Sequence, residues 1–192
     1  NLYLSAHQHS WQYTLGADGK SITATCVNTT NCPHIDGGSV TIKAPEENTL
    51  IYDGSNKKAI LENKLLTGEK DPTISYTVGN GQGATLPDGS YPTNVGAYTA
   101  SITVGGVTAS VTYEIQKADP AAKNFVFTAP GSLTYDGMAK TADIKTATNI
   151  TGMGDVMVKY YQGETEVQPM NAGEYKVNIS VADGSNFSAE SD

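Results

Sequence analysis

Residues 92–104 read PTNVGAYTASITV, and residues 169–181 read PMNAGEYKVNISV. In both stretches, apolar and polar side chains alternate after the tyrosine, which is the period of a strand that buries one face. Three shorter matches precede this pair in the same order: VTIKAP with FVFTAP, TLIYDG with SLTYDG, and ISY with VKY. Because the matches are collinear, we conclude that the chain contains an internal repeat.

The turns and the alternation together predict an all-β fold. Asp-Gly pairs recur through the chain, Gly105-Gly106 joins two alternating runs, and no segment shows a helical stripe. We predict two tandem immunoglobulin-like β-sandwich modules preceded by a short N-terminal β-hairpin, with β-grasp-like modules as the alternative. The polar linker around Pro120 separates the copies, and the second copy lacks a counterpart of residues 107–117. The predicted domains are the hairpin at 1–37, the first module at 38–117 and the second module, without its last strand, at 118–192.

The composition excludes two classes of partner. The formal net charge is -8, and all 12 basic residues are lysines. A protein that binds nucleic acid needs a basic surface and commonly uses arginine to contact phosphate and bases, so we exclude nucleic acid. No run of eighteen apolar residues occurs, so we expect no membrane insertion. The chain starts at Asn1 without a signal peptide, and we expect it to be part of a longer, processed protein.

The paired motifs resemble the YDG/MBG-type repeats of bacterial cell-surface proteins. Tyr52-Asp53-Gly54 is followed by Asn94-x-Gly96-x-Tyr98, and the second copy has Tyr135-Asp136-Gly137 followed by Asn171-x-Gly173-x-Tyr175. The resemblance implies arrays of modules in secreted or wall-attached, adhesin-like proteins of Gram-positive bacteria, and it implies no catalysis. From the residues themselves, we expect core tyrosines at all four positions, with Tyr98 and Tyr175 bonded to main chain, and glycines where a side chain would not fit.

We therefore expect a non-catalytic stalk or adhesion module that is extracellular, either secreted or attached to the cell wall. The alternatives are a module that binds a host glycan or host protein, and an accessory domain of a secreted glycosidase. We expect a monomeric array within a longer chain. Glu164 and Glu166 share a strand face and are the main candidates for acid–base chemistry, but polar neighbours surround them, which favours solvated charges.

The residues that can carry chemistry gather before residue 37. All three histidines and both cysteines occur there, around a turn at residues 16–19. Whether the turn residues are 17–18 or 18–19, strand alternation places His7, His9 and Cys26 on one face. A short loop after Cys26 can fold Cys32 over the same end of the hairpin. Two histidines and two cysteines are a normal tetrahedral zinc set, and His34 is a spare ligand.

We accordingly predict a structural zinc ion held by His7, His9, Cys26 and Cys32. A Cys26–Cys32 disulfide with no metal is the alternative, and free thiols are a third interpretation. We prefer the metal because it accounts for four residues, whereas the disulfide accounts for two. A catalytic zinc would need an open coordination position and a nearby general base, and the hairpin offers only Asp18, at its far end.

Overall fold

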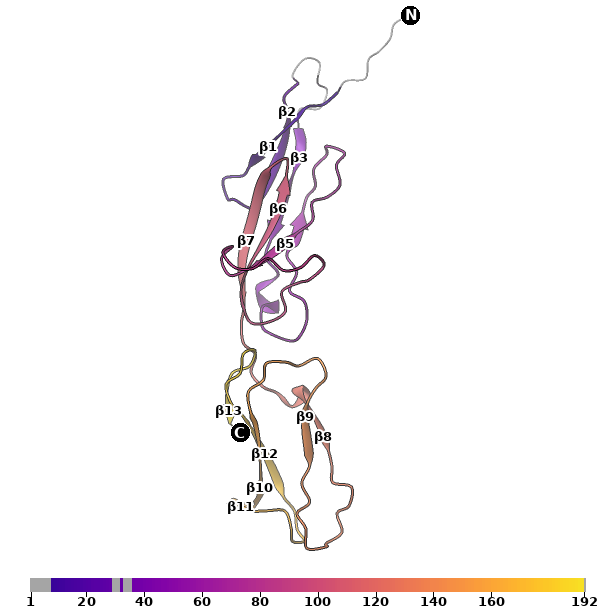
Figure 1. Cartoon of the computed structure of the whole chain (residues 1–192), viewed down its shortest axis with the longest axis vertical. Helices are drawn as coiled ribbons and strands as arrows, with labels where there is room; N and C mark the ends of the chain where they lie inside the picture. Colours follow the sequence, from indigo (N-terminus) through magenta and orange to yellow (C-terminus); the bar gives the residue numbers. More distant parts are fainter. Residues whose placement is uncertain (1–7, 29–31, 33–35, 192) are drawn as a thin grey trace, which may run out of the picture. The chain divides into compact units, whose positions relative to one another are not determined.

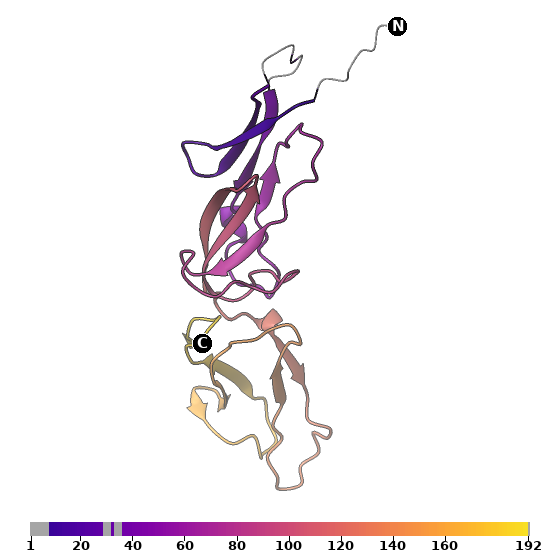
Figure 2. The same ribbon diagram turned by 45° about the horizontal axis from the view of Figure 1, so that its top comes forward.

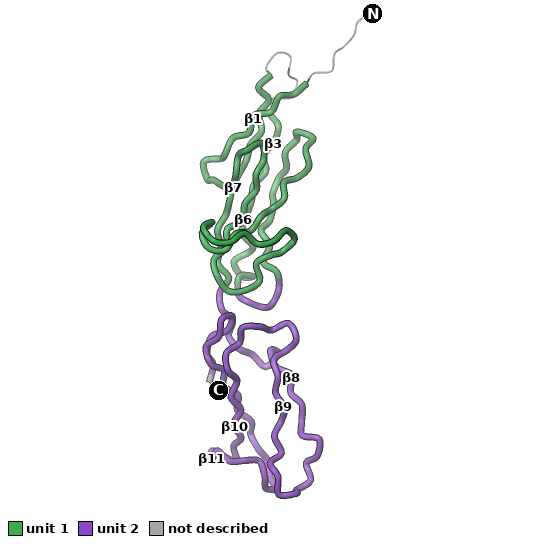
Figure 3. Tube along the Cα trace, viewed as in Figure 1, with its two compact units in different colours: residues 1–50, 56–115 green, residues 51–55, 116–192 purple. Residues whose placement is uncertain are grey.

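The computed structural model describes residues 8–28, 32 and 36–191 (Figure 1). It is nearly all β, with 42% of residues in strands and 3% in helices, which confirms the predicted fold class. The described chain divides into two compact units (Figure 3). The first unit holds the residues up to Leu50 together with Asn56–Ile115, and the second holds Ile51–Ser55 together with the residues from Gln116 onward.

The first unit contains two antiparallel sheets (Figures 1 and 2). The four-stranded sheet has the order β1-β2-β3-β4, so the two strands of the expected N-terminal hairpin pair with the rest of this unit. The three-stranded sheet has the order β5-β6-β7. The strands are β1 (Trp11–Leu15), β2 (Ser21–Cys26), β3 (Asp36–Lys43), β4 (Ile60–Glu62), β5 (Ser75–Val78), β6 (Gly96–Val104) and β7 (Val107–Ile115).

The β1–β2 hairpin turns at Asp18-Gly19, the second of the two turns considered. Its register pairs Trp11 with Cys26, and Gly19 has a φ of 69°, which glycine adopts without strain. The side chain of Asp18 accepts a hydrogen bond from the main chain of Lys20 at 2.9 Å, which closes the turn.

The core of the first unit lies between its two sheets, because β7 packs across β1, β2 and β3. Alternate residues of β2 and of β7 are buried, as the sequence alternation predicts. The buried apolar side chains include Ile22, Ala24, Cys26, Val40, Ile42, Ala100, Ile102, Ala109, Val111 and Ile115. Gly105 and Gly106 form the tight turn between β6 and β7, with φ of 55° and 80°, as predicted.

The second unit contains a two-stranded sheet, β8-β9, and a sheet of order β11-β10-β12-β13. Its strands are β8 (Phe125–Thr128), β9 (Asp143–Thr146), β10 (Val156–Gln162), β11 (Thr165–Glu166), β12 (Lys176–Val181) and β13 (Glu190–Ser191). Two single-turn 3-10 helices, η1 (Glu47–Thr49) and η2 (Ala122–Asn124), lie in the first and second units respectively.

A small core in the second unit surrounds Tyr52. The Tyr52 ring meets Phe187 edge-on at 5.3 Å between centroids, and its hydroxyl lies 3.1 Å from the hydroxyl of Thr151. Both aromatic side chains are buried, as expected for Tyr52. The same expectation for Tyr135 is wrong, because 65% of Tyr135 is exposed. Tyr52 is covered by residues about a hundred positions further along the chain, and the described residues supply no equivalent cover for Tyr135.

Membrane spanning by a helix finds no support in the described part of the chain, where the helices are all too short and insufficiently apolar to cross a bilayer.

Candidate metal centre

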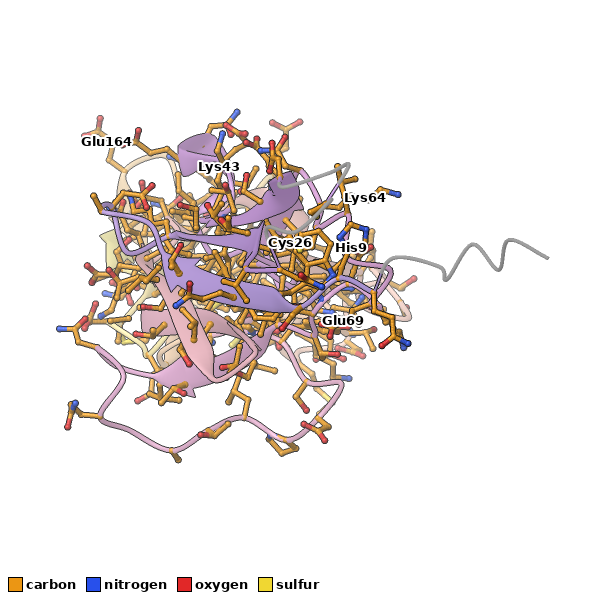
Figure 4. All side chains as sticks on the ribbon, turned by 90° about the horizontal axis from the view of Figure 1, so that it is seen from above. His9, Cys26, Lys43, Lys64, Glu69 and Glu164 are labelled. Atoms are coloured by element: carbon orange, nitrogen blue, oxygen red, sulfur yellow. The ribbon has the colours of Figure 1, made fainter. Side chains whose placement is uncertain are left out.

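The candidate site lies where β2 ends and the chain approaches β1. Cys26 is the last residue of β2, and alternation turns its side chain inward with Ile22 and Ala24, so only 2% of it is exposed. His9 precedes β1, and its ring stacks on Trp11 with 4.8 Å between centroids and 12° between planes. Figure 4 shows His9 and Cys26 next to each other.

The structure brings together three of the predicted ligands. The Cys32 sulfur lies 3.3 Å from Nδ1 of His9, and the ligand atoms of His9, Cys26 and Cys32 all lie within 4.8 Å of one another. The two sulfur atoms are 3.2 Å apart, so the pair is not a disulfide. This group can hold a metal ion.

The distances can be compared with a tetrahedral zinc site. Zinc–sulfur bonds of about 2.3 Å at tetrahedral angles place two sulfur ligands about 3.8 Å apart, and a sulfur and a nitrogen ligand about 3.5 Å apart. The separation between sulfur and nitrogen therefore fits closely, and the two sulfurs need to move apart by only about half an ångström. A disulfide would require the sulfurs to approach by about 1.2 Å, to about 2.05 Å.

The surroundings of Cys26 favour its ionised form. Burial alone raises the pKa of the thiol, but hydrogen bonds with Cys32, with the His9 ring and with main-chain groups of Ser10 and Asn28 outweigh burial and lower the pKa to about 7. The thiolate is the form of cysteine that binds metals. A substantial fraction of Cys26 is thus ready to act as a ligand near neutral pH.

The remaining predicted ligand, His7, and the spare ligand, His34, lie outside the described residues. Two contacts at this end of the hairpin were not predicted, namely the stacking of Trp11 on His9 and the hydrogen bond from Asn28 to the main-chain oxygen of Gln8, at 3.1 Å. Strand alternation could have suggested the first, because His9 and Trp11 share a face.

The carboxylates considered for acid–base chemistry are exposed. Glu166 forms an ion pair with Lys159 at 2.9 Å between oxygen and nitrogen, and both side chains are about half exposed. Glu164 points away from the ribbon (Figure 4). Both carboxylates are thus exposed to solvent, as expected for solvated charges.

Both predicted tyrosine contacts with main chain are confirmed. The Tyr98 hydroxyl donates to the main-chain oxygen of Asn94 at 3.0 Å, and the Tyr175 hydroxyl donates to that of Asn171 at 2.7 Å. The explanation for Gly96 needs correction: a Cβ there would meet only ordinary contacts, and the reason for glycine is its φ of 143°.

Comparison of the chain with protein-family models, with curated proteins and with solved structures gives no match in any of the three.

Proposed function

We propose that this chain is a non-catalytic structural segment, a stalk or adhesion module, of a secreted bacterial surface protein. The observation that carries the proposal is that the two units share one pattern of strand pairing. Tyr76 pairs with Ala100 in the first unit, and Tyr160 pairs with Val177 in the second, and these are matching residues of the two sequence copies. A duplicated scaffold of this kind is typical of repeat arrays.

The other sheet of each unit supports the same conclusion. Thr41 pairs with Glu62 in the first unit, and Val126 pairs with Lys145 in the second, again at matching positions of the two copies. Register is set by which side chains face the core, because a slip of one residue would turn every side chain of the slipped strand to the opposite face of the sheet. Two independent sheets with matching registers therefore support a common module.

The tyrosine hydroxyls of the scaffold serve the main chain in both copies. The amide of Ala59 donates to the Tyr76 hydroxyl at 3.1 Å, and the amide of Ala142 donates to the Tyr160 hydroxyl at 2.7 Å. A further matching pair of main-chain bonds joins Lys57 to Pro92 and Lys140 to Pro169. Groups used to hold strands together in this way stabilise a fold and leave chemistry to other sites.

The resemblance to YDG/MBG-type repeats gives the module its proposed setting. Both Tyr-Asp-Gly motifs lie in the copies that share these registers, which supports immunoglobulin-like modules on the outside of a Gram-positive cell. The acidic net charge of -8 suits a solvated extracellular segment.

Labelling of intact cells tests this setting. Antibodies raised against the chain should label intact cells of the producing organism, and brief treatment of those cells with protease should remove the signal. A cytoplasmic protein labelled in parallel serves as the control for lysis. Labelling that appears only after the cells are broken would contradict an extracellular module.

Within this scaffold, we propose that His9, Cys26 and Cys32 bind one structural zinc ion, with His7 as the fourth ligand. The sulfur–nitrogen separation of 3.3 Å and the lowered pKa of Cys26 support a thiolate and imidazole site. The pairing between β2 and β3 shifts register between Thr23 and Thr25, next to Cys26, so the ladder is irregular where the metal would tie the chain together. Four protein ligands leave no position for a substrate, which is the arrangement of a structural site.

Metal removal tests this proposal through stability. A ligand that binds only the folded state stabilises it by about 2.7 kcal/mol when its concentration is 100 times its Kd. The chain should therefore melt several degrees lower after treatment with a chelator, and added zinc should restore the melting temperature. Cys32→Ser should abolish this response, whereas Gln12→Ala, an exposed change on the same hairpin, should keep it. A wild-type chain with the same melting temperature in zinc and in chelator would contradict the proposal.

A further inference from the structure

Cys26 and Cys32 are placed to react with each other. Their sulfur atoms are 3.2 Å apart, and neither cysteine is in a disulfide. A disulfide bond is about 2.05 Å long, so the two sulfurs need to approach by only about 1.2 Å to form one. The same pair can therefore offer two thiolate ligands to a metal when it is reduced, and can close to a disulfide when it is oxidised.

The two cysteines differ in their exposure to solvent. Cys26 is only 2% exposed, because its side chain points into the core with those of Ile22 and Ala24. Cys32 is half-buried and lies in the stretch of chain between β2 and β3. A small oxidant in solution therefore reaches the sulfur of Cys32 first. The sulfur of Cys26 is then the neighbouring nucleophile that can react with the oxidised Cys32.

A metal at this site depends on both sulfurs. The ligand group of His9, Cys26 and Cys32 comes from three separate stretches of the chain. Zinc binds the thiolate form of cysteine, whereas the sulfurs of a disulfide are neutral and bind it poorly. Oxidation of the pair would leave only histidine ligands, which are fewer than the four protein ligands of a structural zinc site.

We propose that the site is redox-regulated: a peroxide oxidises Cys26 and Cys32 to a disulfide, which releases the zinc ion. This inference rests on the proposed zinc site and adds its regulation. The Cys32 thiolate first takes one oxygen atom from hydrogen peroxide and becomes a sulfenic acid, and the other oxygen leaves as hydroxide. The Cys26 thiolate then attacks the Cys32 sulfur, the sulfur–sulfur bond forms, and a second hydroxide leaves. Two protons from solvent turn both hydroxides into water, so the two sulfurs lose two electrons and the peroxide gains them.

Oxidation changes what the site holds together. The metal ties His9 to the end of β2, whereas the disulfide joins only the two cysteines. The main-chain amide of Val27 donates to the main-chain oxygen of Ser10 at 2.8 Å, so this bond joins the same two stretches of chain. We expect hydrogen exchange at the Val27 amide to become about tenfold faster in the oxidised chain, because local opening there no longer has to break the metal site.

Peroxide treatment of the reduced, zinc-loaded chain tests the proposal. We expect one zinc ion to be released for every two thiols lost, at the same rate, and a peptide map that joins Cys26 to Cys32. Dithiothreitol followed by zinc should restore the thiols, the metal and the slow exchange of the Val27 amide. A disulfide that forms while the zinc stays bound would overturn the proposal, and so would exchange at Val27 that does not change.

Zinc content measured before oxidation separates the two proposals. A chain that takes up no zinc at the start overturns the proposed zinc site, and its regulation with it. A chain that binds zinc and keeps it in peroxide overturns the regulation alone. Peroxide also oxidises exposed methionines, and Met157 is 57% exposed, but dithiothreitol does not reduce methionine sulfoxide. Zinc release that dithiothreitol and zinc fail to reverse would therefore contradict a thiol switch.

Two variants locate the reacting sulfur. Met157→Leu removes an exposed oxidisable sulfur in the second unit and should leave the rate of zinc release unchanged. In Cys32→Ser, the remaining thiol is the buried Cys26, which should react with peroxide at least about tenfold more slowly than the thiols of the metal-free wild-type chain. Equal rates would show that peroxide attacks Cys26 directly and would overturn the proposed order of steps.

Discussion

Replacing Tyr113 with phenylalanine tests whether core hydroxyls hold the first unit together. The Tyr113 side chain is 7% exposed, and its hydroxyl donates a buried hydrogen bond of 2.6 Å to the main-chain oxygen of Lys57. Phenylalanine keeps the ring and its packing but leaves that carbonyl without its donor. The loss of one partner from a buried pair costs about 1–3 kcal/mol. We expect the free energy of unfolding of the first unit to fall by about 2 kcal/mol, within this range.

The matched control is Tyr98→Phe. Tyr98 is as buried as Tyr113, but its bond to Asn94 is longer, at 3.0 Å, and lies in a part-buried site where water can replace the hydroxyl. We expect a smaller loss of about 0.5–1.5 kcal/mol, the net contribution of an ordinary hydrogen bond.

Trp11 allows unfolding of the first unit to be followed alone. It is the single tryptophan of the chain and lies in β1, so its fluorescence during urea unfolding reports on that unit. The midpoint should fall in both variants with an unchanged slope, and further for Tyr113→Phe. A loss below about 0.5 kcal/mol for Tyr113→Phe, or a larger loss for Tyr98→Phe, would show that the Tyr113 hydroxyl does not hold the first unit together.

Three further outcomes are expected. Burial raises the pKa of Tyr113, whereas tyrosine in the unfolded chain ionises near pH 10. Above about pH 10 the unfolded state therefore releases a proton that the folded state keeps, and the urea midpoint of the first unit should fall as pH rises. A urea midpoint that does not change with pH would count against this. Gly106→Ala should cost about 1–2 kcal/mol because of the left-handed φ of residue 106. Gly105→Ala should destabilise the first unit more, because a Cβ at residue 105 would also clash with an aromatic ring; equal urea midpoints for the two variants would show that the ring moves aside. Lys117→Ala removes an exposed ion pair with Asp183 and should lower the free energy of unfolding of the second unit by less than about 1 kcal/mol; a larger loss measured by calorimetry would assign this pair a structural role.

Local patterns predicted the elements that depend on neighbouring residues. Alternation identified β6 and β7, Gly105-Gly106 identified the turn between them, and strand parity placed His9 and Cys26 on one face. These features follow from the two-residue period of a strand and from the φ values that glycine permits, both of which can be read from a short window. The choice of Asp18-Gly19 over the neighbouring turn could not be predicted, since both turns preserve the same parity.

Features that depend on distant residues could not be predicted. Tyr52 and Tyr135 stand in equivalent motifs, yet one is 3% and the other 65% exposed, because the groups that cover Tyr52 come from Thr151 and Phe187. Cys32, which lies between β2 and β3, likewise approaches His9, which is 23 residues earlier in the chain. The sequence allowed either a metal or a disulfide at these cysteines. The separation of the two sulfur atoms decides against the disulfide in this structure.

Native mass spectrometry of the purified chain tests most directly whether the cluster of His9, Cys26 and Cys32 is a structural metal site. We predict a folded species that carries one zinc ion per chain, and a denatured species that has lost the metal and has two reduced thiols. A folded chain with no metal, prepared with zinc present throughout, would contradict a structural zinc site. So would a denatured chain whose mass shows the loss of two hydrogens, because it would place a Cys26–Cys32 disulfide where the zinc ligands are proposed.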